Sequence, residues 1–120
     1  MMVIVLSQSS CYNDNEEELY PEGSVPCDTT AITFSGTVWP VINDNCTSCH
    51  SNPSPSGNVL LENYDDVAAA GLIPAGEYGS LYGAISHDSG NSPMPKNNSK
   101  LSDCTIQQVE IWINAGVPDN

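Results

Sequence analysis

Basic side chains are almost missing from this sequence. The 120 residues include only 2 Lys and Arg against 15 Asp and Glu, which gives a formal net charge of −13. Nucleic acids and anionic membrane surfaces are bound through clustered positive charge, so the composition argues against both as partners. The charge favours basic partners, and the alternative is that it serves solubility alone.

The sequence also lacks a long apolar run. No stretch approaches the ~18 consecutive apolar residues that a membrane-spanning helix needs. Apolar residues make up 39% of the chain, which also contains 9 Gly and 9 Pro. A chain so short and so rich in loop-forming residues has room for one domain at most. We expect it to need a stabilising element beyond its own side chains.

Strand-like alternation and internal repeats are absent as well, and the pattern predicts a small all-α fold with long loops. The segment TFSGTVWPVINDN predicts a short helix with Pro40 in or near its first turn. A second helix is expected at about 65–70, ended by Gly71. A third is expected in GEYGSLYGAISHD, beginning at Ser80 or at the glycine turn before it.

The last segment, LSDCTIQQVEIWINAG, gives the clearest helical signal. Ser102 is a suitable N-cap, Asp103 favours the first turn, and Gly116 is placed to end the helix. Its apolar residues fall on one face at helical spacing. They are Ile106, Val109, Trp112 and Ile113.

The first 26 residues differ from the rest in composition. MMVIVLSQSSC looks like the end of a bacterial lipoprotein signal, with cleavage before Cys11 leaving that cysteine to carry a lipid. The alternative is an N-terminus without fixed structure that contains an unpaired cysteine. The acidic, polar residues 11–26 suit a flexible tether. We therefore expect a signal remnant over 1–10, a tether over 11–26 and one domain over 27–120.

The strongest motif is CTSCH at residues 46–50, and this motif allows three interpretations. A thioredoxin-like redox pair needs its cysteines at the start of a helix after a parallel strand, and no strand pattern precedes Cys46. A structural zinc site needs four ligands. The candidates for such a site are Cys46, Cys49 and His50 with His87, or with the distant Cys27 and Cys104.

A covalently attached haem explains the motif best. Two thiols at this separation, Cys46 and Cys49, can add across the vinyl groups of one haem, and His50 then falls beneath the iron as proximal ligand. One haem c would also supply apolar bulk that this chain lacks.

Two residues are candidates for the sixth iron ligand. Met94 lies in SPMPK, where the flanking prolines restrict the backbone and can present a thioether at low ordering cost. His87 lies at the end of a predicted helix, where it is also explained as a helix-terminal histidine. We favour Met94 over His87 or an open site.

The chain resembles class I-type monohaem cytochrome c domains, in particular the small cytochrome c lipoproteins of Bacteroidetes-type bacteria. The resemblance covers residues 27–118. It is most specific in CTSCH and the closing helix. The matching segments are VWPVINDNCTSCH, GNVLLENYDDV, GSLYGAI, SPMPK and LSDCTIQQVEIWINAG.

This resemblance implies a small all-α cytochrome c fold of 4–5 short helices around one haem, with the N- and C-terminal helices crossing. It implies thioether links at Cys46 and Cys49, His50 and Met94 as iron ligands, and electron transfer as the role. With Cys11 assigned to a lipid, Cys27 and Cys104 remain. We expect a disulfide between them worth about 3–4 kcal/mol; the alternative is two free buried thiols.

The sequence therefore predicts a single-haem electron carrier rather than an enzyme, exported to the periplasm or cell surface and anchored through the lipid on Cys11. Its expected partners are redox proteins, in a respiratory or surface electron-transfer complex. The alternatives are a ligand-binding or peroxidase-like haem protein with an open sixth site, and a haem-bearing subunit of a larger membrane complex. The only basic residues, Lys96 and Lys100, follow Met94. They are expected to offset the haem propionates, to dock an acidic partner, or simply to be solvated.

Overall fold

The computed structural model of the chain describes residues 26–120. The segments expected to form a signal remnant and a tether lie outside this range up to residue 25, and so does Cys11, the expected site of lipid attachment. Within it the chain forms helices and loops without a strand, which confirms the all-α class for this part. None of the helices in this part is long and apolar enough to span a membrane.

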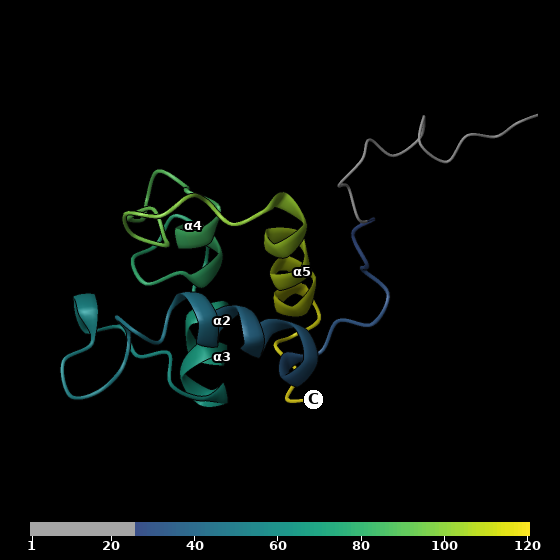
Figure 1. Ribbon diagram of the computed structural model, residues 1–120, viewed down its shortest axis with the longest axis horizontal. Helices are drawn as coiled ribbons and strands as arrows, with labels where there is room; N and C mark the ends of the chain where they lie inside the picture. Colours follow the sequence, from purple (N-terminus) through teal and green to yellow (C-terminus); the bar gives the residue numbers. More distant parts are fainter. Residues whose placement is uncertain (1–25) are drawn as a thin grey trace, which may run out of the picture.

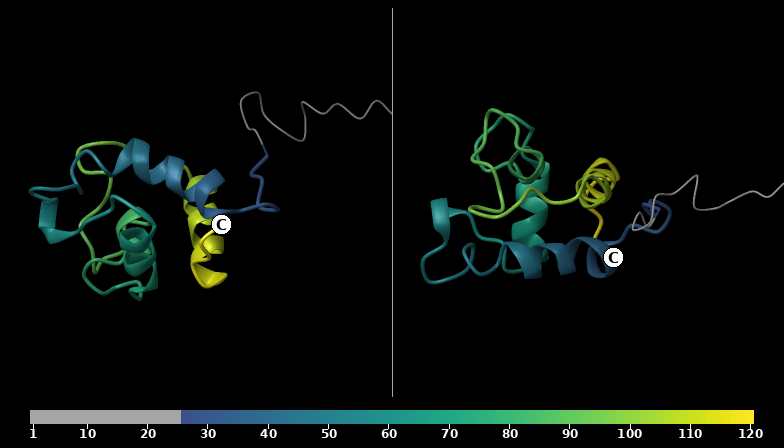
Figure 2. Two further views of the ribbon diagram at one scale, coloured as in Figure 1. Left: turned by 90° about the horizontal axis from the view of Figure 1, so that it is seen from below. Right: turned by 45° about the horizontal axis from the view of Figure 1, so that its top comes forward.

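Four α-helices and two short helical turns make up the described domain, and Figure 1 shows their arrangement. The N-terminal helical stretch lies across one end of α5, whereas α4 packs against both α3 and α5 (Figures 1 and 2). In chain order the elements are η1 (Phe34–Val38), α2 (Trp39–Asn45), η2 (Ser56–Asn58), α3 (Tyr64–Leu72), α4 (Leu81–Ile85) and α5 (Asp103–Asn114).

The first helical stretch begins earlier than the sequence predicted. Thr33 caps it by accepting a hydrogen bond from the Gly36 amide (3.0 Å). The turn η1 that follows is a π-helix, and it runs directly into α2, in which Pro40 occupies the first turn as expected. A proline ring clashes with the carbonyl four residues before it in a regular α-helix. The wider π turn ahead of Pro40 relieves that clash, so the helix extends back to Phe34.

The prediction that Gly71 ends the second helix was wrong. Gly71 is buried inside α3, which continues to Leu72 and stops before Pro74. A Cβ atom on Gly71 would lie 3.2 Å from Trp112 and 3.2 Å from Val117. The absence of a side chain at Gly71 therefore allows α3 to pack closely against Trp112 and Val117, and does not end the helix.

The start of α4 and both ends of α5 lie where the sequence predicted. Ser80 caps α4 by accepting from the Gly83 amide (3.1 Å), and Ser102 caps α5 by accepting from the Thr105 amide (3.1 Å). Gly116 has a φ of +92° after the last turn of α5. Its amide bonds to Ile113 and that of the next residue to Trp112, the pattern of a Schellman motif.

An aromatic cluster joins the N-terminal helical stretch to the other helices. The ring of Phe34 lies 5.6 Å from Trp112 on α5, 5.1 Å from Tyr64 on α3 and 5.9 Å from Trp39, measured between centroids. Trp112 is only 1% exposed. Aromatic pairs at these separations add to the stability that area burial alone provides. The cluster thus fixes the ends of three helices against one another.

A disulfide lies at the opposite end of α5. The sulfur atoms of Cys27 and Cys104 are 2.03 Å apart and close a loop with a sequence separation of 77. This is the pair that the sequence analysis expected. The Gln108 amide also donates to the Asp28 carbonyl (2.8 Å), so the chain ahead of η1 is held against the first turns of α5.

Candidate functional site

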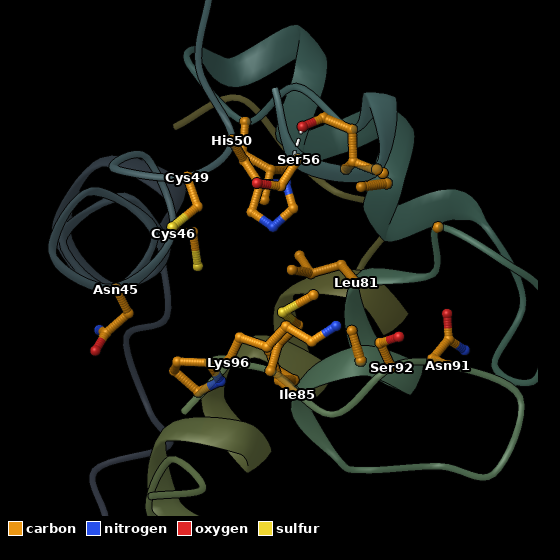
Figure 3. A pocket seen from close by; sticks show the side chains of 18 of the residues that line it. Asn45, Cys46, Cys49, His50, Ser56, Leu81, Ile85, Asn91, Ser92 and Lys96 are labelled. Carbon is orange, nitrogen blue, oxygen red and sulfur yellow. Dashed lines mark hydrogen bonds between the residues drawn. The ribbon is translucent and has the colours of Figure 1, made fainter. Parts of the chain in front are cut away.

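A cavity of about 540 Å³ opens between the end of α2, the helix α4 and the loop that follows α4. Its walls include Leu61, Leu81 and Ile85, which are also members of the hydrophobic core. Cavities of roughly 300–1,000 Å³ with apolar walls are typical of cofactor and ligand sites. Figure 3 shows Cys46, Cys49 and His50 on one side and α4 across from them.

The end of α2 brings the three residues of the CTSCH motif to this cavity. Cys46 is the C-cap residue of α2, and its amide bonds to the Ile42 carbonyl (2.8 Å). The Cys46 carbonyl then accepts from the amides of Cys49 (3.2 Å) and His50 (3.0 Å). This turn folds the motif back on itself, and all three side chains line one wall.

The His50 ring is held in one orientation. It is 8% exposed, and its Nδ1 lies 2.9 Å from the Val59 carbonyl. A carbonyl only accepts hydrogen bonds, so Nδ1 carries the proton and Nε2 keeps a free lone pair. Figure 3 shows the ring pointing into the cavity. The group that orients the ring is thus a main-chain carbonyl nine residues further along the chain.

The two motif cysteines differ in their surroundings. Cys49 is exposed, whereas Cys46 is buried. Burial, with a smaller contribution from Cys49, raises the pKa of the Cys46 thiol to about 11. Redox-active cysteines in CxxC motifs have lowered pKa values. The environment of Cys46 is therefore unlike that of a thioredoxin-type pair.

The loop after α4 supplies the facing wall, and Met94 is among the residues that line the cavity. Its amide donates to the Ala84 carbonyl on α4 (3.1 Å). Ser92 and Lys96, from the same loop, lie across the cavity from His50 in Figure 3. The structure therefore brings Met94 to the same cavity as Cys46, Cys49 and His50. Met94 follows His50, the nearest of the three in sequence, by 44 positions.

His87, the other candidate ligand, lies outside the cavity lining. Its side chain is exposed, and its Nε2 donates to the Met94 main-chain carbonyl (3.0 Å). The ring thus contacts the back of the Met94 loop. This geometry favours Met94 over His87 as the residue presented to the cavity.

The cavity differs in charge from the rest of the molecule. Although the chain has a formal net charge of −13, Asp and Glu are absent from the described residues that line the cavity, where Lys96 supplies a positive charge. Lys100 is exposed but is not part of the lining. A carboxylate-bearing ligand would therefore meet little repulsion from the cavity wall.

The arrangement does not supply the ligands of a structural zinc ion. Cys27 and Cys104 are bonded to each other, and the His87 ring contacts Met94. Over residues 26–120, no three His, Cys, Asp or Glu side chains are grouped so that they could hold a metal ion. Tetrahedral zinc sites take four such ligands, so the cavity residues fit this chemistry poorly.

Comparisons with known proteins were made against family models, curated sequences and solved structures. None of the three comparisons finds a match. The assignment of the site therefore depends on its own residues and geometry.

The residues present fit a covalently attached haem. The donor set combines an imidazole nitrogen and a thioether, both of which ligate haem iron, with two thiols at the spacing of c-type attachment. Part of the cavity wall, which includes Leu61, Leu81 and Ile85, is apolar and continuous with the core, and this part could pack against a largely apolar macrocycle.

Some contributors to the site were not found from the sequence. The Tyr78 hydroxyl donates to the Gly57 carbonyl (2.8 Å) and joins two loops that both line the cavity. The partners of this bond and of the His50–Val59 bond are main-chain carbonyls, which carry no signal in the sequence. The apolar character of Leu61 was visible, but its position in the cavity wall was not.

Proposed function

We propose that this chain is a single-haem c-type cytochrome that carries electrons, with a cytochrome c fold and His/Met ligation. The observation that carries the proposal is that Cys46, Cys49, His50 and Met94 line one cavity. The free Nε2 of His50 supports this further, because a proximal histidine needs an unprotonated ring nitrogen directed at the metal.

When bound, the haem would supply a one-electron Fe(III)/Fe(II) couple. The thioethers formed by Cys46 and Cys49 would hold it covalently, while the Val59 carbonyl keeps the His50 ring oriented. Leu61, Leu81 and Ile85 exclude water from the cavity. Ligation of the iron by the Met94 thioether and low solvent access would both raise the reduction potential of this couple. No acid–base residue is needed for outer-sphere electron transfer.

The first test is haem attachment. The full chain, expressed with the haem-attachment machinery of c-type cytochromes, should give one haem per chain in a pyridine haemochrome assay. Its intact mass should increase by one haem under denaturing conditions. Replacing both Cys46 and Cys49 by Ala should abolish the covalent increment. A wild-type mass without it contradicts the proposal.

The second test concerns the sixth ligand. Met94→Leu preserves side-chain volume but removes the thioether, so the far-red ferric charge-transfer band of Met ligation should disappear while the covalent haem remains. Leu101→Met is the matched control, because it exchanges the same two residue types at another cavity-lining position and should keep the band. High-spin ferric iron that binds cyanide rapidly in the wild-type protein would instead support the alternative with an open sixth site.

A further inference from the structure

His87 occupies a backbone position that normally belongs to glycine. It follows the last turn of α4 with a φ of +61°. Its amide bonds to the Ala84 carbonyl (3.3 Å) and the Asp88 amide to the Gly83 carbonyl (2.9 Å), so α4 ends in a Schellman motif with His87 at the left-handed position. Histidine adopts this conformation at a cost that glycine avoids.

The side chain gives a reason for that cost. The His87 Nε2–H donates to the Met94 carbonyl (3.0 Å). The Met94 amide donates to the Ala84 carbonyl (3.1 Å), which also caps α4. Both peptide groups that flank the Met94 side chain are thus bonded to the end of α4. A glycine at position 87 would form the same helix cap but could make only one of these two links.

We propose that His87 is a positioning residue that fixes the Met94 backbone so that its thioether is presented to the cavity. The inference rests on the proposed function, because it takes Met94 as the iron ligand. A methionine side chain has three rotatable bonds, so its ordering is costly unless the backbone that carries it is already fixed. Residues with a strained backbone conformation cluster at functional sites, where the surrounding structure holds them in place.

The test compares His87→Gly with His87→Asn. Glycine removes both the ring and the strain, whereas asparagine tolerates the left-handed conformation but is too short to replace the imidazole. Asn58→Gly is the matched control. Asn58 has a φ of +57° and lies outside the cavity lining, and its side chain makes no hydrogen bond within the described residues.

Two readouts separate positioning from a general effect on stability. The first is the rate of cyanide binding to the ferric protein, which depends on release of Met94. Both His87 variants should bind cyanide about two- to tenfold faster, the range expected for the loss of one hydrogen bond.

The second readout is the temperature at which the far-red band is lost, compared with the midpoint of global unfolding measured by far-ultraviolet circular dichroism. In His87→Gly the band should be lost at a lower temperature, while the global midpoint stays level or rises.

The outcomes are distinct. If the wild-type protein carries covalent haem but lacks the far-red band, Met94 is not the ligand and the inference falls together with the proposed ligation. If the wild-type band is present and both His87 variants match Asn58→Gly in cyanide binding, only the inference is overturned. Parallel losses of the band and of global stability would also overturn it, because His87 would then be a structural residue alone.

Discussion

Gly71 is the residue whose role the sequence suggested least well. Its position near the end of an apolar segment resembled a helix stop, but it lies inside α3 against Trp112 and Val117. Gly71→Val should therefore lower the free energy of unfolding by about 1–3 kcal/mol, because the added methyl groups overpack this contact. Denaturant titration followed by circular dichroism would measure the change.

Ala69→Val provides the control for that substitution. Ala69 lies in the same helix but is exposed, so the same side chain should change the free energy of unfolding by only about 0.5 kcal/mol. A loss for Gly71→Val no larger than that for Ala69→Val would contradict overpacking at position 71, because replacing Gly by Val does not by itself lower helix propensity.

Single residues of the site could be predicted when their chemistry is carried by the side chain. Cys46, Cys49 and His50 follow from a spacing that haem attachment requires, and Met94 from its two flanking prolines. The partner of the His50 ring could not be predicted, because every residue in the loop offers a carbonyl. His87 was predicted as a candidate ligand, but its bond to the Met94 carbonyl depends on the left-handed backbone conformation of His87, which the sequence does not predict.

At the scale of elements, the helix starts that a serine caps were predictable. Ser80 and Ser102 each cap a helix through the same side-chain bond, but they differ in burial. Ser80 is fully buried and Ser102 is exposed. Ser80→Ala should cost about 1–2 kcal/mol of unfolding free energy, because it leaves the buried Gly83 amide without a partner.

Ser102→Ala serves as the comparison for this prediction. Water can replace the lost bond at an exposed cap, so the expected cost is smaller, about 0.5–1 kcal/mol. Chemical denaturation of the two variants under identical conditions would measure the difference. A larger loss for Ser102→Ala than for Ser80→Ala would contradict the role assigned to burial.

The start of the first helical stretch was not predictable in the same way. The expected first helix had Pro40 in or near its first turn, whereas the structure extends the helical stretch back to Phe34 through a π turn. Such a turn depends on how Phe34 packs against α3 and α5, which is a tertiary contact. Local propensity contains no information about that contact, and this explains the error.

At the scale of the molecule, the disulfide should contribute more to stability than any single cap. Reducing it, or replacing both Cys27 and Cys104 by Ala, frees a loop with a sequence separation of 77. The chain-entropy model gives a loss of about 4 kcal/mol for a loop of this size. Thermal or denaturant unfolding of the double variant would measure it.

The same variant should leave the haem site intact. Cys27 and Cys104 are not part of the cavity lining, so covalent attachment and the far-red band should persist at temperatures below unfolding. Loss of the band in the folded double variant would mean that the disulfide also shapes the cavity.

The all-α class was predictable from the sequence, but the cavity was not. Its walls come from the end of α2, the loop around Val59, α4 and the loop that carries Met94. Each segment could be recognised by itself. Their meeting around one space depends on packing between distant segments, and a single sequence does not encode that packing in any local pattern.

The aromatic cluster gives this chain an internal optical reporter. Its 2 tryptophans, Trp39 and Trp112, both contact Phe34 and neither lines the cavity. In the haem-free chain, tryptophan fluorescence therefore reports on the junction between the N-terminal helical stretch and α5. In a haem-loaded chain, energy transfer would quench this fluorescence, so its recovery would report separation of the junction from the cavity, while haem absorbance would report on the cavity itself. Recorded on one sample, the two signals would show whether both ends of the domain come apart together.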